Sequence, residues 1–367
     1  MKNTSLAQVI LGAVSVVALA AGCPTFDPGS RGNDDAIASD DGAGGGDSLD
    51  TGSSASSLAS QCVPADPNAL LFQKAICVCE QVREFASVTT GGFSSFGNLR
   101  DSEHRGDVGI NQGLDTVGQF LIDGALEVGG LIRGMGPLVT TGDLWAGSDW
   151  QHAGHASIGG NAQIGGDLSV LGQMTVAGSL AVAGDVSLLG HLYCGNVTEG
   201  AAVAPRSPCD CDPATLLDVA ATVAANANAT PLALARGWGQ QVLMLTAGAY
   251  YDSDGTTWLG HSKIVIDGAV QIYIDGDVNL AGASKFELTD GAQLDLYIAG
   301  AVREMGWLGV GDMTTASHAV RIYIGGSEPV AVSLMGRSRF AGAIYAPQAD
   351  IRFVGDLRID GALFARN

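Results

Sequence analysis

Five aspartates in the C-terminal half could supply acids for catalysis, and arginines that could hold an anion follow them. The aspartates are Asp267, Asp275, Asp277, Asp290 and Asp295, and the arginines are Arg303, Arg321 and Arg352. Polysaccharide lyases and hydrolases use clustered carboxylates, calcium and a basic residue to cleave sugar chains. Nearly all of these aspartates adjoin glycine or the end of a strand-like segment, where Asp is favoured because it tolerates turns. We therefore interpret them as turn residues and keep polysaccharide cleavage as the alternative.

The six histidines offer no clear metal site. Only His152 and His155 are close in sequence. His152 takes an inward or corner position, and we interpret the two as a surface pair near a bend, with a metal site as the alternative. No Ser-His-Asp order occurs. The sequence also has no phosphate-binding loop or dinucleotide fingerprint, because its Gly-x-Gly matches lie in strand-like segments without a following helix. The sequence predicts no catalytic residue, no metal and no cofactor.

Three tyrosines repeat at the centre of an aliphatic-Tyr-Ile motif: Tyr273, Tyr297 and Tyr323. Side chains alternate across a strand, so inward aliphatic residues would leave these rings stacked on the outer face. Structural stacking is the favoured interpretation. A ladder that stacks on carbohydrate is the alternative, with Tyr251, Trp258 and Trp307 as further members.

Six cysteines form two modules with the same spacing. Cys62, Cys77 and Cys79 make up the first module, and Cys194, Cys209 and Cys211 repeat both of its intervals. Disulfides are the default outside the cytoplasm, and six cysteines allow fifteen pairings. Because each module holds an odd number, full oxidation requires at least one bond between the modules. Metal binding by the two Cys-x-Cys pairs is the alternative, although zinc sites usually have Cys-x₂-Cys.

A six-residue repeat, here called a phrase, occurs fifteen times over residues 104–193 and must position side chains in that region, such as His152 and His155. Glycine recurs at every sixth position with two exceptions, and the position two places later is always apolar, as in Leu126, Leu144, Leu168 and Leu180. Alternation with a bend in every phrase is typical of a parallel β-helix, a solenoid of stacked short strands. Three phrases per turn would give five rungs that rise ~24 Å.

Residues 235–367 form a second strand-rich region with a longer period. The Tyr273, Tyr297, Tyr323 and Tyr345 motifs recur at nearly even intervals, each longer than three hexapeptide phrases, which predicts one wider turn per motif. In the hexapeptide region glycine follows the aliphatic residue by two positions, which favours right-handed coiling. We predict an all-β fold of two parallel β-helical coils, with cysteine-containing caps at 62–103 and 194–234.

Each cap is expected to hold a short helix after its Cys-x-Cys pair. The better candidate starts at Asp212-Pro213, an N-cap followed by proline, and ends near Asn226 or Asn228. The segment 68–85 is its looser counterpart.

The N-terminus resembles a bacterial lipoprotein signal. Lys2 precedes an apolar run that ends Leu19-Ala20-Ala21-Gly22-Cys23. The resemblance implies removal of residues 1–22 and a diacylglycerol anchor on Cys23, which places the protein outside the cytoplasm, with the outer membrane as the expected site. Residues 24–61 are rich in Gly, Ser and Asp and are expected to form a tether spanning ~35 Å.

Residues 209–367 resemble an uncharacterised bacterial β-helical domain of lipid-anchored and secreted proteins. The matching segments are Cys209-Asp210-Cys211-Asp212-Pro213, residues 273–278, residues 294–300, and residues 340–347 with 361–365. The resemblance implies fold and export. Separately, the hexapeptide coil resembles bactofilin-type polymer-forming scaffolds.

Charge and composition narrow the partners. Asp and Glu outnumber Lys and Arg by 38 to 18, a net charge of −20, which excludes a basic surface for nucleic acid. We expect a structural, adhesive or scaffold role at the cell envelope. The expected partners are membrane lipid through Cys23, a polysaccharide or envelope protein, and further copies of the chain through the open coil ends.

Overall fold

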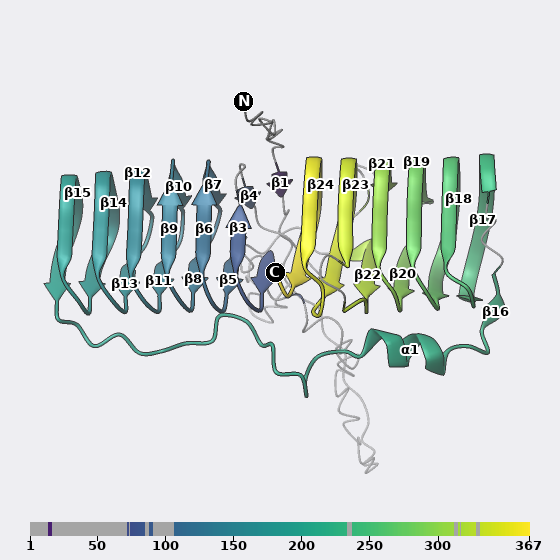
Figure 1. Ribbon diagram of the computed structural model, residues 1–367, viewed down its shortest axis with the longest axis horizontal. Coiled ribbons are helices and arrows are strands. Elements are labelled where there is room, and N and C mark those ends of the chain that lie inside the picture. Colours follow the sequence, from purple (N-terminus) through teal and green to yellow (C-terminus); the bar gives the residue numbers. More distant parts are fainter. Residues whose placement is uncertain are drawn as a thin grey trace, which may run out of the picture.

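The computed structural model describes residues 14–16, 72, 74–84, 88–90, 106–232, 237–311, 315, 317–327 and 331–367. These residues form an all-β parallel solenoid of about 11 turns with one short α-helix (Figure 1). We call β2 to β15 the first coil and β16 to β24 the second coil.

The strands of the first coil are short and regularly spaced. They are β2 (Ile76–Val78), β3 (Val82–Glu84), β4 (Val88–Thr90), β5 (Val108–Ile110), β6 (Leu114–Val117), β7 (Phe120–Ile122), β8 (Leu126–Val128), β9 (Ile132–Met135), β10 (Leu138–Thr140), β11 (Leu144–Ala146), β12 (Trp150–Ile158), β13 (Ala162–Ile164), β14 (Leu168–Val182) and β15 (Val186–Glu199).

The second coil has longer strands. They are β16 (Thr230–Pro231), β17 (Gly237–Asp252), β18 (Thr256–Ile274), β19 (Val278–Leu288), β20 (Gln293–Ile298), β21 (Val302–Val310), β22 (Val320–Ile324), β23 (Val332–Ala346) and β24 (Ile351–Ala365). A 3₁₀ turn, η2 (Ser317–Ala319), precedes β22, and a separate strand, β1 (Val14–Val16), lies beside β24.

The hexapeptide repeat forms the rungs of the first coil as predicted. Leu126 is in register with Leu144, and Ala162 with Leu180, so one turn takes three phrases. The apolar positions point inward, and Leu126, Leu144 and Leu180 are buried. The parallel β-helix predicted from alternation is therefore confirmed for this region.

Aspartate and asparagine side chains line the corners of the first coil. Asp143 Oδ1 accepts from the backbone N–H of Asn161 at 2.7 Å, and Asp167 Oδ1 accepts from that of Asp185 at 2.9 Å. Each bond joins a corner to the equivalent corner of the next rung. A corner N–H that strand pairing leaves without a partner is thus satisfied by a side chain of the preceding rung.

The second coil takes one turn per tyrosine motif, as its sequence spacing predicts. Tyr273 is in register with Tyr297, Tyr297 with Tyr323, and Tyr323 with Tyr345. The inward column beside them is apolar, with Ile272 and Ile274 buried.

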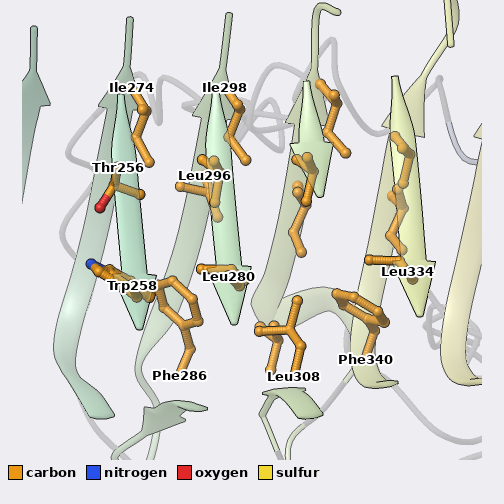
Figure 2. Close-up of a pocket in the computed structure, with 17 residues that line it drawn as sticks. Thr256, Trp258, Ile274, Leu280, Phe286, Leu296, Ile298, Leu308, Leu334 and Phe340 are labelled. Carbon is orange, nitrogen blue, oxygen red and sulfur yellow. The ribbon is translucent and has the colours of Figure 1, made fainter. Parts of the chain in front are cut away.

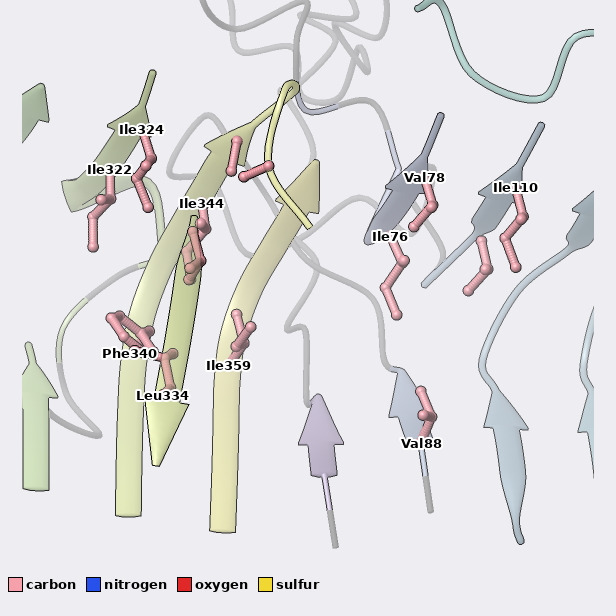
Figure 3. Close-up of a cluster of buried hydrophobic side chains, with 14 of the residues drawn as sticks. Ile76, Val78, Val88, Ile110, Ile322, Ile324, Leu334, Phe340, Ile344 and Ile359 are labelled. Atoms are coloured by element: carbon pink, nitrogen blue, oxygen red, sulfur yellow. The ribbon is translucent and has the colours of Figure 1, made fainter. Parts of the chain in front are cut away.

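The two coils join into one continuous stack. The sequence predicted two separate coils and did not predict this junction. Leu363 of β24 is in register with Ile76 of β2, and β2 pairs on its other side with β5. We call this β24–β2 junction the seam. Apolar side chains from both coils face the interior around it, including Ile344 and Ile359 on one side and Ile76 and Ile110 on the other (Figure 3).

A long connection, the strap (residues 200–229), returns the chain from β15 to β16 at the opposite end of the stack (Figure 1). It contains the single described α-helix, α1 (Val219–Ala225), which starts later than predicted. Asp218 rather than Asp212 is the N-cap, and its side chain accepts from Ala221 N at 2.9 Å. The C-cap, Asn226, agrees with the prediction.

The two Cys-x-Cys pairs do not cap coil ends, because Cys77 and Cys79 bond to Cys209 and Cys211 at the seam in the middle of the stack. The helix expected over 68–85 is also wrong where the structure describes it, since β2 and β3 lie there. Burial of Ile76 and Val78 in the common core outweighs the weak helical pattern. In the described part of the chain, no helix is long and apolar enough to span a membrane.

Candidate functional site

Two disulfides fasten the strap to the seam. Cys77 is bonded to Cys209 and Cys79 to Cys211, with Cα–Cα distances of 5.8 and 5.7 Å. Ile76 and Val78 face the core, so alternation turns Cys77 towards the outer face where the strap passes. Both bonds join the two cysteine modules. The odd number of cysteines in each module had predicted at least one such bond. Cys194 in β15 is a free thiol, and Cys62 lies outside the described residues.

Polar contacts hold the strap against the first coil. Cys209 N donates to Asn111 Oδ1 at 2.8 Å, and Asn111 Nδ2 donates back to Cys209 O at 3.0 Å. The Arg206 guanidinium lies 5.7 Å from the ring centre of Trp145 and 3.5 Å from Glu127 Oε1. Trp145 is consequently buried although its strand neighbours Leu144 and Ala146 occupy the inward positions.

The tyrosine ladder lies beneath the strap on the second coil. The ring centres of Tyr273 and Tyr297 are 5.0 Å apart, and those of Tyr297 and Tyr323 are 4.5 Å apart, with nearly parallel planes. The rings point away from the core, as alternation predicts. They are nevertheless at most 5% exposed, because Val219 and Val223 of α1 belong to the same buried cluster. In this arrangement the ladder has no open face on which a sugar could stack.

Residues of the second coil next to α1 allow the helix to pack closely against the outer face of the strands. Gly325 faces the helix, and a Cβ there would lie 3.2 Å from Val219 Cβ. Leu217 N donates to the Tyr345 hydroxyl at 2.9 Å. Burial raises the pKa of Tyr345 to about 12, so this hydroxyl stays neutral at physiological pH. The strap, the ladder and the seam thus form one packed unit.

The candidate acids of the second coil are tied into separate contacts between rungs. Asp295 forms a two-point ion pair with Arg321 at 2.6 and 2.9 Å, and Asp277 pairs with Arg303 at 2.7 Å. The Ala301 N–H and then Arg303 lower the pKa of Asp277.

The remaining members of that set are also dispersed. Asp275 accepts from the Tyr251 hydroxyl at 2.9 Å, and Asp267 accepts from the Thr289 hydroxyl at 3.0 Å. Asp290 lies in an exposed turn, as interpreted from the sequence, and Arg352 is exposed on β24. No two of these carboxylates form a facing pair in these contacts.

His152 is an interior residue, which agrees with the inward or corner position expected for it, but its interpretation as part of a surface pair was wrong. Its side chain is 4% exposed beside Trp150, with Nε2 3.3 Å from the His155 carbonyl oxygen. Burial lowers the pKa of His152. Among the described residues, no three His, Cys, Asp or Glu side chains gather into a metal site.

The interior of the second coil contains a cavity of only about 40 Å³ (Figure 2). Apolar side chains such as Trp258, Phe286 and Phe340 line it together with Thr256. This space is small and its lining is almost wholly apolar, so the lumen is a packed core. A wider, open groove of about 440 Å³ lies on the first coil beside Arg133, Met135 and Leu171.

Comparison with known families gives one match. Residues 210–367 match a family described as a domain of unknown function (DUF7305). That match and the solenoid architecture support the expected uncharacterised β-helical domain in this half of the chain. Comparisons with curated proteins and with solved structures find no significant match.

Proposed function

We propose that this protein is a lipid-anchored scaffold of the bacterial cell envelope, which acts through the shape and surface of a rigid wall. The observation that carries this proposal is the continuous stack of the two coils across the seam. It gives a rod of ~50 Å from about 11 turns at ~4.8 Å each. Two candidate acids of its second coil, Asp277 and Asp295, form ion pairs with arginines of the next rung, which suits a structural surface.

The anchor in this proposal is Cys23. The lipoprotein-like signal and the acidic tether support it, although all of the tether and Cys23 itself lie outside the described residues. A multiply acylated cysteine would hold the protein stably at a bilayer, since each buried CH₂ contributes ~0.8 kcal/mol. The right-handed coiling that the glycine spacing favours remains part of the proposal.

The open coil ends support self-association within this role. In β15, Leu189 is 73% and Tyr193 55% exposed; in β17, Val242 is 75% and Met244 63% exposed. A terminal strand also presents a row of backbone donors and acceptors to a further strand. Two copies could therefore pair end to end, as the two coils do at the seam.

Three experiments test the proposed function. Cys23→Ser should move the protein from the membrane fraction to the soluble fraction of the envelope, and protease added to intact cells should cleave the wild type if it faces outward. Membrane association that is unchanged by Cys23→Ser would contradict the anchor. Release of reducing or unsaturated sugar ends from envelope polysaccharide, lost in Asp275→Asn or Asp295→Asn, would replace the scaffold role with catalysis.

A further inference from the structure

One strand position beside the seam is filled from outside the contiguous coil. In one column of the solenoid, Leu363, Ile76, Val108 and Leu126 follow one another in register. In the adjacent column, residues 357–359 of β24 pair with Val14–Val16 of β1, and β4 pairs with β7. At the level of β2 this column therefore contains β1, which lies between β24 and β4 (Figures 1 and 3). We call this position the slot.

Phe72, which comes shortly before β2, does not lie in the slot. A continuous coil would place the residues just before β2 in this column. Phe72 instead lies buried in the cluster of the tyrosine ladder, with its ring centre 6.4 Å from that of Tyr323 and 6.3 Å from that of Tyr345. Phe72 thus lies on the strap side, and the strand that occupies the slot is β1.

Export would remove the strand that fills the slot here. Val14–Val16 belongs to residues 1–22, which the lipoprotein-like signal marks for cleavage, so this inference rests on the proposed function. Without a replacement, β24 and β4 would expose backbone groups beside an apolar interior.

The slot selects an extended, apolar segment. Ile359 is fully buried, so the position opposite it in a paired strand also faces the core. Val88 and Thr90 on β4 are buried on the other side. The tether of residues 24–61 is mostly Gly, Ser and Asp and suits this position poorly.

We propose that the slot is a strand-acceptor site, which in the exported protein binds one extended apolar segment of a partner polypeptide by parallel β-augmentation. Backbone hydrogen bonds to β24 and β4 provide affinity, and the inward position opposite Ile359 selects an aliphatic residue. A proline at the centre of the segment is excluded because it lacks the N–H.

A peptide with the sequence of residues 11–19, flanked by lysines for solubility, tests this proposal. It would be added to the processed chain, residues 23–367 with Cys23→Ser. We expect saturable binding at one peptide per chain, a higher midpoint of thermal unfolding, and slower amide hydrogen exchange in residues 357–359 and 88–90. The matched peptide with proline in place of Ser15 should show none of these effects.

Two results would overturn the proposal. One is failure of the peptide to bind or to slow exchange at these residues. The other is full protection of residues 357–359 before any peptide is added, which would show that the chain fills the slot itself. The mass of the native exported protein tests the premise separately: retention of residues 1–22 would refute cleavage, whatever the peptide does.

Discussion

Ile76 and Leu363 are strand neighbours although they lie far apart in the sequence. Leu363 N donates to the Ala75 carbonyl at 2.9 Å, and Cys79 N donates to the Ala365 carbonyl at 2.9 Å. These bonds place the C-terminus at the middle of the rod and leave both outer ends to β15 and β17. The strap must then return along the whole stack, which explains why its fastening point lies at the seam.

Substitutions at adjacent residues of one strand should differ in their effect on stability, because one side chain is buried and the next is partly exposed. Leu180 is fully buried, whereas Ala181 is partly exposed beside it in β14. Leu180→Asp places a charge in the apolar core and should prevent folding of the first coil, whereas Ala181→Asp should change the free energy of unfolding by only about 0.5 kcal/mol. Circular dichroism during urea unfolding measures both, and equal tolerance of the two variants would refute the inward assignment.

The two disulfides should contribute non-additively to stability. Each bond has a sequence separation of 132, and closing a loop of that length is worth about 5 kcal/mol in the chain-entropy model. Once one bond is present, the other closes only a very short ring, worth about 2 kcal/mol. Removing either pair by Cys→Ser should therefore cost about 2 kcal/mol, and removing both pairs about 7 kcal/mol.

Denaturant unfolding of the single-pair and double-pair variants checks this relation. Equal and additive losses would contradict it, since they would mean that each bond restricts the unfolded chain independently. Non-reducing peptide mapping should also recover Cys77 with Cys209 and Cys79 with Cys211.

Corner glycines should differ sharply in their tolerance of a side chain. Gly172 has φ +133°, and a Cβ there would lie 2.2 Å from the Gly154 carbonyl oxygen of the preceding rung. The nearest atom to a Cβ on Gly195 is 3.3 Å away. Gly172→Ala should destabilise the fold by at least about 2 kcal/mol, and Gly195→Ala by clearly less. Thermal unfolding compares them, and an equal loss would show that inter-rung contact is not the cause.

The stability of the second coil should depend on the protonation of Glu304. Its side chain is 1% exposed, and burial raises its pKa above 4.5, although the Ser338 hydroxyl and the Met335 N–H oppose the shift. The folded state therefore binds the proton more tightly than the unfolded state, and stability falls as pH rises from 4.5 through the folded pKa. Glu304→Gln should be more stable than the wild type above this window and lose that advantage below pH 4.5.

Glu287 provides the matched control for this pH dependence. Lys285 and then Lys263 lower its pKa, so its contribution is present above 4.5 and lost as pH falls through the folded pKa. Glu287→Gln should therefore show the opposite sign in the same thermal unfolding series. A Glu304→Gln curve parallel to that of the wild type at every pH would contradict the assignment.

Local pattern was sufficient to predict the rungs. The apolar position in every hexapeptide phrase and the tyrosine spacing each specify which residue stacks on which, because alternation and turn position fix the register. The corner bonds from Asp143 and Asp167 were missed, although the recurrence of Asx directly after the glycine position could have revealed them. Their role depends on the neighbouring rung, which alternation alone does not identify.

The seam and the strap were beyond prediction from one sequence. Nothing in the Ile76 or Leu363 segments marks them as partners, since any apolar strand end of this type could pair with several others. The repeated cysteine spacing did indicate a bond between modules, but not that α1 would cover Tyr297 and Tyr323. A side chain that points outward from a strand is exposed only if no other segment of the chain packs on that face.

The distance between the two free ends of the stack tests the continuous rod most directly. Spin labels at Thr198→Cys in β15 and Val242→Cys in β17, with Cys23, Cys62 and Cys194 replaced by serine, can be measured by double electron–electron resonance. Collinear coils joined at the seam predict a single narrow distribution near ~50 Å, from about 11 turns at ~4.8 Å. A broad distribution, or a peak below about 30 Å as in coils packed side by side, would contradict the joined stack.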